Sequence, residues 1–188
     1  MFRNIVALCW IVNTVTSQTV PSLRLSAYYG RWLQMYSDYA VKASFEHDIV
    51  CDSAYYYPYT NGTVAVVNSG NYYTASGNLS QVRGWAQQQN PSEPGRLTVH
   101  LQPTGGVGAP YWIYKLGPIV NGSYQYSVVS DDIKLTLFVL ARNYTTFFDE
   151  YVQEVVTWLF RNGFNGVFNS PIPTNQTNCE YPDTTFLT

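Results

Sequence analysis

The stretch that decides the fold is VCDSAYYYPYTNGTVAVVN, residues 50–68. It contains two runs of aromatic and β-branched residues, 50–57 and 63–68, on either side of the dipeptide Asn61-Gly62. Runs of this composition are typical of β-strands, and Asn-Gly is typical of a tight turn between antiparallel neighbours. The segment therefore predicts two strands joined by a short connection.

The same pattern continues on both sides of this segment. Apolar runs alternate with turn residues, among them Asn121-Gly122 and a glycine-rich loop at 104–110. The candidate strands are 31–36, 50–57, 63–68, 79–87, 96–101, 111–116, 123–129 and 134–141. Eight regularly spaced strands without helices between them predict a single all-β domain, either an antiparallel barrel or a sandwich.

One segment near the C-terminus follows a helical period instead. Between 146 and 160, apolar side chains recur every three or four residues, at Phe148, Val152, Val155, Val156 and Leu159. Thr146 and Asp149 resemble a capping box at the start, and Gly163 followed by Phe164 is typical of the end. Since an apolar stripe must pack on something, we expect this helix on the outside of the sheet.

The N-terminus has the features of a secretory signal peptide. Arg3 supplies a positive charge, an apolar run extends from 5 to 12, and Ser17 is a small residue suited to cleavage. A buried N-terminal strand is the alternative. We expect residues 1–17 to be removed and 18–188 to form one domain with a C-terminal tail, secreted to the extracellular space.

Export also determines how the cysteines and asparagines are interpreted. Removal of Cys9 with the leader leaves Cys51 and Cys179. In an oxidising compartment such a pair favours a disulfide over free thiols or a metal site. The same compartment permits glycosylation, and the chain has Asn-x-Ser/Thr sequons at Asn61, Asn78, Asn121, Asn143 and Asn175.

Composition argues against two classes of partner. Only 12% of residues are charged, the net charge is −2, and no basic run is present, whereas a nucleic-acid groove needs a positive stripe. The longest apolar run, 5–12, is far shorter than the ~20 residues needed to cross a bilayer. We therefore expect neither a nucleic-acid partner nor a transmembrane segment.

A closed barrel of eight strands has an interior that holds packed side chains or one small ligand. Alternation places Val64, Val66 and Asn68 on one face of their strand, although a register slip of one residue would invert the set. The resulting lining is mostly apolar with scattered tyrosine hydroxyls, which is typical of a small-molecule pocket.

Two short motifs resemble those of the lipocalin family. Gly30-Arg31-Trp32 is similar to the Gly-x-Trp motif of the first strand, and Leu140-Ala141-Arg142-Asn143 is similar to the closing Arg motif. Segments 93–99 and 109–113 resemble strands of the apolipoprotein D and bacterial lipocalin subgroup, and Cys51 and Cys179 match its strand-to-tail disulfide. The resemblance implies an eight-stranded antiparallel up-and-down barrel with one C-terminal α-helix packed outside. The resemblance also implies a Thr-Asp-Tyr type motif after the sixth strand, but this chain has Leu116-Gly117-Pro118 at that place.

The resemblance also implies roles for individual residues. Trp32 would plug the closed end, with Arg142 over its ring and Gly30 permitting a close approach; these roles are structural. The ligand-binding positions would be Tyr56, Asn68, Tyr111, Phe138 and Leu140.

The lipocalin arrangement orders the loops as well. Segments 37–49, 69–78, 102–110 and 130–134 would surround the open mouth, and 58–62, 88–95 and 117–122 would lie at the closed end. The sequons Asn61, Asn121 and Asn143 then fall near the closed end, and only Asn78 falls near the mouth.

These features predict a secreted carrier of a small hydrophobic ligand such as a lipid, fatty acid or steroid. A pigment-binding protein for a bilin or carotenoid is the alternative, followed by a lipocalin-type enzyme or a ligand-free interaction module. Enzymes of the family that use a free cysteine inside the barrel have no match here, and His47 and His100 belong to no nucleophile or metal motif. We expect no catalysis, cofactor or metal, and peripheral contact with a membrane or lipoprotein surface is left open.

Overall fold

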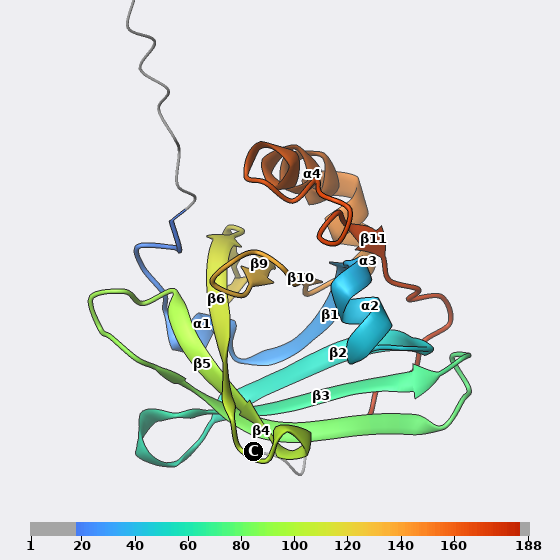
Figure 1. Ribbon diagram of the computed structural model, residues 1–188, viewed down its shortest axis with the longest axis horizontal. Helices are drawn as coiled ribbons and strands as arrows, with labels where there is room; N and C mark the ends of the chain where they lie inside the picture. Colours follow the sequence, from blue (N-terminus) through green and yellow to red (C-terminus); the bar gives the residue numbers. More distant parts are fainter. Residues whose placement is uncertain (1–17, 185–188) are drawn as a thin grey trace, which may run out of the picture.

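The computed structural model describes residues 18–184, so the expected signal peptide and Cys9 lie outside the described range. Eight antiparallel strands follow one another around a barrel: β1 (Gly30–Ser37), β2 (Ile49–Pro58), β3 (Val64–Tyr72), β4 (Leu79–Gln88), β5 (Arg96–Leu101), β6 (Gly108–Leu116), β9 (Tyr126–Ser130) and β10 (Leu137–Ala141). The last strand, β10, pairs with β1 and closes the sheet (Figure 1). The predicted up-and-down barrel is confirmed.

Several short elements differ from the expected strand pattern. The segment 123–129 is divided, because β8 (Ser123–Tyr124) pairs with β7 (Ile119–Val120) in a separate ribbon at the turn after β6. The strand expected at 134–141 begins only at residue 137. The carboxylate of Asp131 accepts hydrogen bonds from the backbone of Ile133, Leu135 and Thr136, which holds those residues in a turn. The short turns η1 (Thr60–Gly62) and η2 (Gln102–Thr104) lie in the connections after β2 and β5.

The C-terminal helix packs on the outside of the barrel, as predicted. It consists of α3 (Tyr144–Thr146), a wider turn η3 (Phe147–Tyr151) and α4 (Val152–Arg161). The expected capping box is wrong: the side chain of Asn143 caps the helix by accepting from the Thr146 amide at 2.9 Å, and Asp149 is exposed. The predicted end is confirmed, since Gly163 has a φ of +91° and the Phe164 amide donates to the Leu159 carbonyl.

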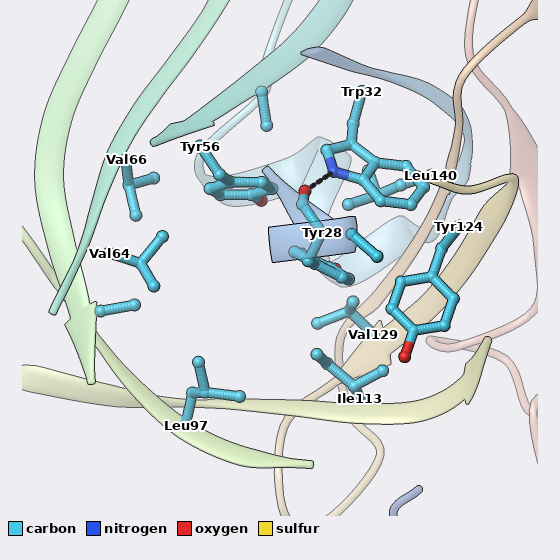
Figure 2. Close-up of a cluster of buried hydrophobic side chains, with 13 residues drawn as sticks. Tyr28, Trp32, Tyr56, Val64, Val66, Leu97, Ile113, Tyr124, Val129 and Leu140 are labelled. Carbon is cyan, nitrogen blue, oxygen red and sulfur yellow. Dashed lines mark hydrogen bonds between the residues drawn. The ribbon is translucent and has the colours of Figure 1, made fainter. Parts of the chain in front are cut away.

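Two apolar clusters lie on opposite sides of the barrel wall. The inner cluster includes Trp32, Tyr56, Val64, Val66 and Leu97 (Figure 2), so the predicted facing of the strand after Asn61-Gly62 is correct. The outer cluster joins β1, β9 and β10 to the helix through Met35, Val128, Val139, Phe147, Val155 and Leu159. The strands and the helix therefore form the side wall of the barrel, and other segments cover its two ends.

Two short helices lie near those ends. The first, α1 (Leu25–Tyr28), precedes β1, and the second, α2 (Tyr39–Ser44), lies in the connection between β1 and β2. A two-residue strand, β11 (Ile172–Pro173), pairs with the end of β1.

None of the helices described between residues 18 and 184 has the length and hydropathy of a membrane-spanning segment.

Candidate functional site

The closed end of the barrel is plugged by an indole under a guanidinium. The Trp32 side chain is fully buried, and its Nε1 donates to the Tyr28 carbonyl at 2.8 Å (Figure 2). The guanidinium carbon of Arg142 lies 3.7 Å from the centre of the Trp32 ring. This geometry is a close cation–π contact, so the structural roles inferred for Trp32 and Arg142 match the observed arrangement.

Arg142 also ties the chain together at this end. Its guanidinium donates to backbone carbonyls of α1, β1, β8 and the residue between α1 and β1, namely those of Ala27, Tyr28, Tyr29, Arg31 and Tyr124. Burial lowers its pKa to about 10, so the group stays charged at neutral pH. Gly30 has a φ of +98°, and a side chain there would begin 3.3 Å from Arg142 Nη1, which is why this position is glycine.

A chain of buried hydroxyl groups lies above the plug. Tyr28 extends from α1 into the barrel, where its hydroxyl is 2.9 Å from that of Tyr111 and 3.0 Å from Ser127 Oγ. The Tyr56 hydroxyl is 3.0 Å from that of Tyr111. Burial raises the pKa of all three phenols, that of Tyr28 to about 12, so they act as neutral hydrogen-bonding groups.

The open space inside the barrel is small. A cavity of about 10 Å³ lies among side chains that include Leu25, Tyr28, Val64, Leu97 and Ile113. That volume accommodates about one water molecule, whereas drug-sized ligands occupy pockets of roughly 300–1,000 Å³. Tyr28 fills much of the floor, and the sequence interpretation missed it because the residue precedes the first strand.

The five residues expected to bind a ligand all belong to the inward face. Tyr56 and Leu140 are buried members of the inner cluster, and Tyr111 and Phe138 pack against it. Asn68 pairs with Ala54 of β2, also an inner-cluster residue, which places it on the same face. Only Tyr56 and Tyr111 line the small cavity. Their function in binding stays a prediction.

The mouth of the barrel contains a partly buried polar cluster that the sequence interpretation did not identify. Lys42 Nζ, from α2, lies 3.0 Å from Glu46 and 3.2 Å from Asp52 of β2. Gln34 Nε2 donates to Glu46 at 2.8 Å. Burial, aided by the negative charge of Glu46, raises the pKa of Asp52 to about 7 despite the opposing effect of Lys42.

The C-terminal segment 172–179, called the strap here, fills a gap in the wall between β1 and β2. Thr174 donates its amide to the Met35 carbonyl of β1, and the Cys51 amide of β2 donates to the Asn175 carbonyl, both at 2.9 Å. The Gln176 side chain donates to backbone carbonyls of both strands. The disulfide between Cys51 and Cys179 fixes the end of the strap, so the predicted pairing is confirmed.

The sequons are distributed over both ends of the barrel. Asn121 lies in the β7–β8 ribbon, Asn143 follows β10, and Asn61 lies in η1, all at the closed end. Asn78 precedes β4 at the mouth. The expectation that only Asn78 lies near the mouth is wrong, because the strap carries an exposed Asn175 into the mouth half of the wall.

The histidines lie apart from each other and from the interior. The His47 side chain is 73% exposed and lies 2.8 Å from Asp48, and the His100 ring stacks on Trp85 outside the barrel. In the part of the chain that the structure describes, no three His, Cys, Asp or Glu side chains are grouped to hold a metal ion. The bonded Cys51 offers no free thiol.

A closed eight-stranded barrel with a Trp–Arg plug and an external helix defines a lipocalin. The chain belongs to the lipocalin-like domain family, whose model matches residues 23–166. It is 40% identical to mouse apolipoprotein D over 86 residues and 39% identical to the rat protein over 89 residues. Each match covers 46% of this chain and 42% of the relative, so less than half of these relatives is spanned.

Solved structures show the same fold at low identity. The cockroach allergen Per a 4 superposes with a TM-score of 0.60 at 17% identity, covering 85% of this chain and 92% of the allergen. Apocrustacyanin C1 gives 0.61 at 18%, covering 84% and 83%. The amine-binding protein of Rhodnius prolixus, solved with tryptamine, gives 0.58 at 15%, covering 90% and 91%. These similarities support the barrel.

Proposed function

We propose that the protein binds and carries a small hydrophobic molecule inside its barrel. The observation that carries this proposal is the inward face itself, which is mostly apolar along β3, β5 and β10. Four of the expected binding residues belong to or pack against the inner cluster, and Asn68 shares the face through its pairing with Ala54. Burial of an apolar ligand is favourable by roughly 25 cal/mol per Å² before the loss of freedom on binding is counted. The buried tyrosine hydroxyls offer hydrogen bonds that orient a polar group on the ligand.

The small volume of the cavity means that the interior must rearrange to bind a ligand. A ligand with more than a few carbon atoms enters only if side chains move, because about 10 Å³ is open. The mouth is the end that can yield. Its cover consists of the six-residue α2 and side-chain contacts, whereas the closed end is held by Arg142 and its carbonyl partners.

The proposal is tested by titrating the folded protein with cis-parinaric acid and following its fluorescence. Replacing Leu97 with Trp fills the interior and should abolish saturable binding. The matched control is Thr98→Trp on the next residue, which lies outside the inner cluster and should leave binding intact. Equal binding by both variants, or none by the unaltered protein with this acid or with retinol, would contradict an interior site.

Secretion through a signal peptide at 1–17, and the disulfide and glycans that suit it, are part of the same proposal. The bonded pair Cys51–Cys179 supports an oxidising compartment, since cytosolic proteins rarely keep such bonds. A bilin or carotenoid as the ligand would be revealed by visible absorption of protein purified from its source.

Contact with a lipid surface is supported by the mouth loops. Each of the four loops expected there exposes an apolar side chain by 70% or more: Phe45, Tyr73, Val107 and Ile133. Side chains of this kind insert readily into a headgroup region. Co-sedimentation with phosphatidylcholine vesicles should therefore be reduced by Phe45→Asp, and unchanged by Phe160→Asp on the external helix.

A further inference from the structure

A groove lies on the outer face of the barrel, away from the helix. The helix covers β1, β9 and β10, whereas β3 and β4 lie on the other side of the barrel (Figure 1). The groove has a volume of about 480 Å³, within the range of small-molecule pockets and far larger than the interior cavity. Its lining includes Tyr57, Ala65, Val67, Arg83 and Trp85.

The strand register explains why a groove forms here. Tyr57 of β2 pairs with Ala65 of β3, which pairs with Trp85 of β4. One row nearer the mouth, Val67 of β3 lies beside Arg83 of β4. Small outward side chains on β3 therefore lie between larger ones on both neighbours. Ala65 and Val67 are only 4% and 3% exposed, so the accessible surface of the groove is formed mainly by the flanking side chains, and one flank on each side is aromatic.

The aromatic wall on β4 is held in place by its neighbour. The His100 ring stacks on Trp85, with centroids 3.9 Å apart and planes 14° from parallel. His100 Nδ1 lies 2.8 Å from the Gly106 carbonyl. Because a carbonyl only accepts, Nδ1 carries the proton and donates it, which anchors the stacked pair to the loop after η2.

The groove also has a cation without an acidic partner. The Arg83 guanidinium donates through Nε and Nη2 to the neutral Gln81 side chain, at 3.2 and 3.1 Å. Among residues 18–184 it forms no ion pair, unlike Lys42, Arg96 and Lys115, and its side chain is exposed. A planar guanidinium suits a carboxylate, which it binds through two parallel hydrogen bonds.

We propose that this groove is a second ligand site, for a small planar aromatic carboxylate. The ring of the ligand lies against the side chains of Tyr57 and Trp85, which flank the buried Ala65, and its carboxylate pairs with Arg83. Aromatic walls select a flat ring, and the unpaired cation selects the anion over a neutral molecule of the same shape. The site is separate from the barrel interior, because the residues proposed to contact the ligand, Tyr57, Arg83 and Trp85, are absent from the inner cluster and from the lining of the interior cavity.

Calorimetric titration with 2-naphthoate, and with 2-naphthylmethanol as an uncharged analogue, tests the proposal. Arg83→Gln should weaken the affinity for 2-naphthoate about tenfold, as expected for loss of a charge-assisted pair, and should change the affinity for the alcohol less than twofold. Ala65→Phe should abolish binding of both. Val64→Phe, the adjacent substitution on the inward face, should leave both unaffected while blocking parinaric acid.

The matched positions keep the test decisive. Val64 and Ala65 are both 4% exposed but face opposite sides of β3, so general damage to the fold would affect the two variants alike. If Ala65→Phe does not fold, Tyr57→Ala takes its place and should weaken both probes. The proposal is overturned by absence of saturable 2-naphthoate binding, by equal effects of Arg83→Gln on acid and alcohol, or by loss of binding in Val64→Phe alone.

Discussion

The two ends of the barrel are closed by different means. At the closed end, one arginine donates to five backbone carbonyls and covers the Trp32 ring, so its polar atoms are matched by fixed acceptors. At the mouth, Lys42 contacts the carboxylates of the buried Asp52 and the half-buried Glu46, and the strap completes the wall. From this difference we expect the closed end to be the more rigid part of the molecule and the mouth to be the part that changes shape.

The largest expected effect breaks the closed end. Arg142→Met removes the cation–π contact and leaves several carbonyls without donors, which should lower the free energy of unfolding by about 3–5 kcal/mol. Urea denaturation measures this loss. Arg161→Gln, at an exposed position on the last turn of α4, should change stability by less than about 0.5 kcal/mol. Similar losses in both variants would remove the special role of the plug.

The next effect is expected at the mouth. Replacing both Cys51 and Cys179 with Ser releases the strap and should lower the free energy of unfolding by about 2–4 kcal/mol, since the bond joins residues 128 positions apart. Hydrogen exchange should accelerate at the Thr174 amide and stay slow at the Trp32 indole nitrogen. Equal acceleration at both sites would show that the two ends unfold together.

A third prediction uses pH to separate the ends. Burial raises the pKa of Asp52 to about 7, so the folded chain holds a proton that the unfolded chain releases near pH 4. The contribution of Asp52 to the free energy of unfolding is therefore fully present below pH 4 and is lost as pH rises through 7. The slope of this loss is at most about 1.4 kcal/mol per pH unit.

Unfolding curves between pH 5 and 8 check this slope. Asp52→Asn should reduce the fall of the free energy of unfolding with rising pH. A smaller fall should remain, because the pKa of Asp38 is also raised, to about 6. Asp149→Asn, at an exposed position, changes the net charge equally and should leave the slope unaltered. An unchanged slope in Asp52→Asn would contradict the assignment of this proton uptake to Asp52.

The smallest effect concerns the helix start beside the plug. Asn143→Ala removes the cap and the sequon and should lower the free energy of unfolding by about 1 kcal/mol. Asn143→Asp keeps an accepting oxygen while abolishing the sequon, so its stability should stay within a few tenths of a kcal/mol. Comparing the stabilities of the two variants in protein made without glycans isolates the effect of the helix cap. Glycopeptide mapping of the unaltered protein tests whether the Asn143 sequon carries a glycan.

Features set by local pattern were predictable from the sequence. Alternation identified the inward face of β3, and the three-to-four spacing located the external helix. The helix start was misplaced because Asn143 and Thr146 both have capping side chains, and only the backbone path decides which one meets a free amide. The strand expected at 134 began later because Asp131 gathers three backbone donors.

The candidate site was predictable only in part. Tyr56, Asn68, Tyr111, Phe138 and Leu140 were placed on the inward face correctly, but nothing in their spacing indicates how much room they leave. Tyr28 occupies part of that room, and it belongs to the four-residue helix α1, which lies outside the strand pattern. The polar cluster at the mouth was missed for a similar reason, since Gln34 meets Glu46 and Thr174 from separate parts of the chain.

The sequence by itself determined the strands, the external helix, the paired cysteines and the Trp32–Arg142 plug, because each depends on residue type at short spacing or on a motif. Only the tertiary structure decided the volume of the interior, the strap between β1 and β2, and the groove over β3. These features depend on which side chains from distant segments occupy the same space, and that is fixed by strand register and closure of the sheet.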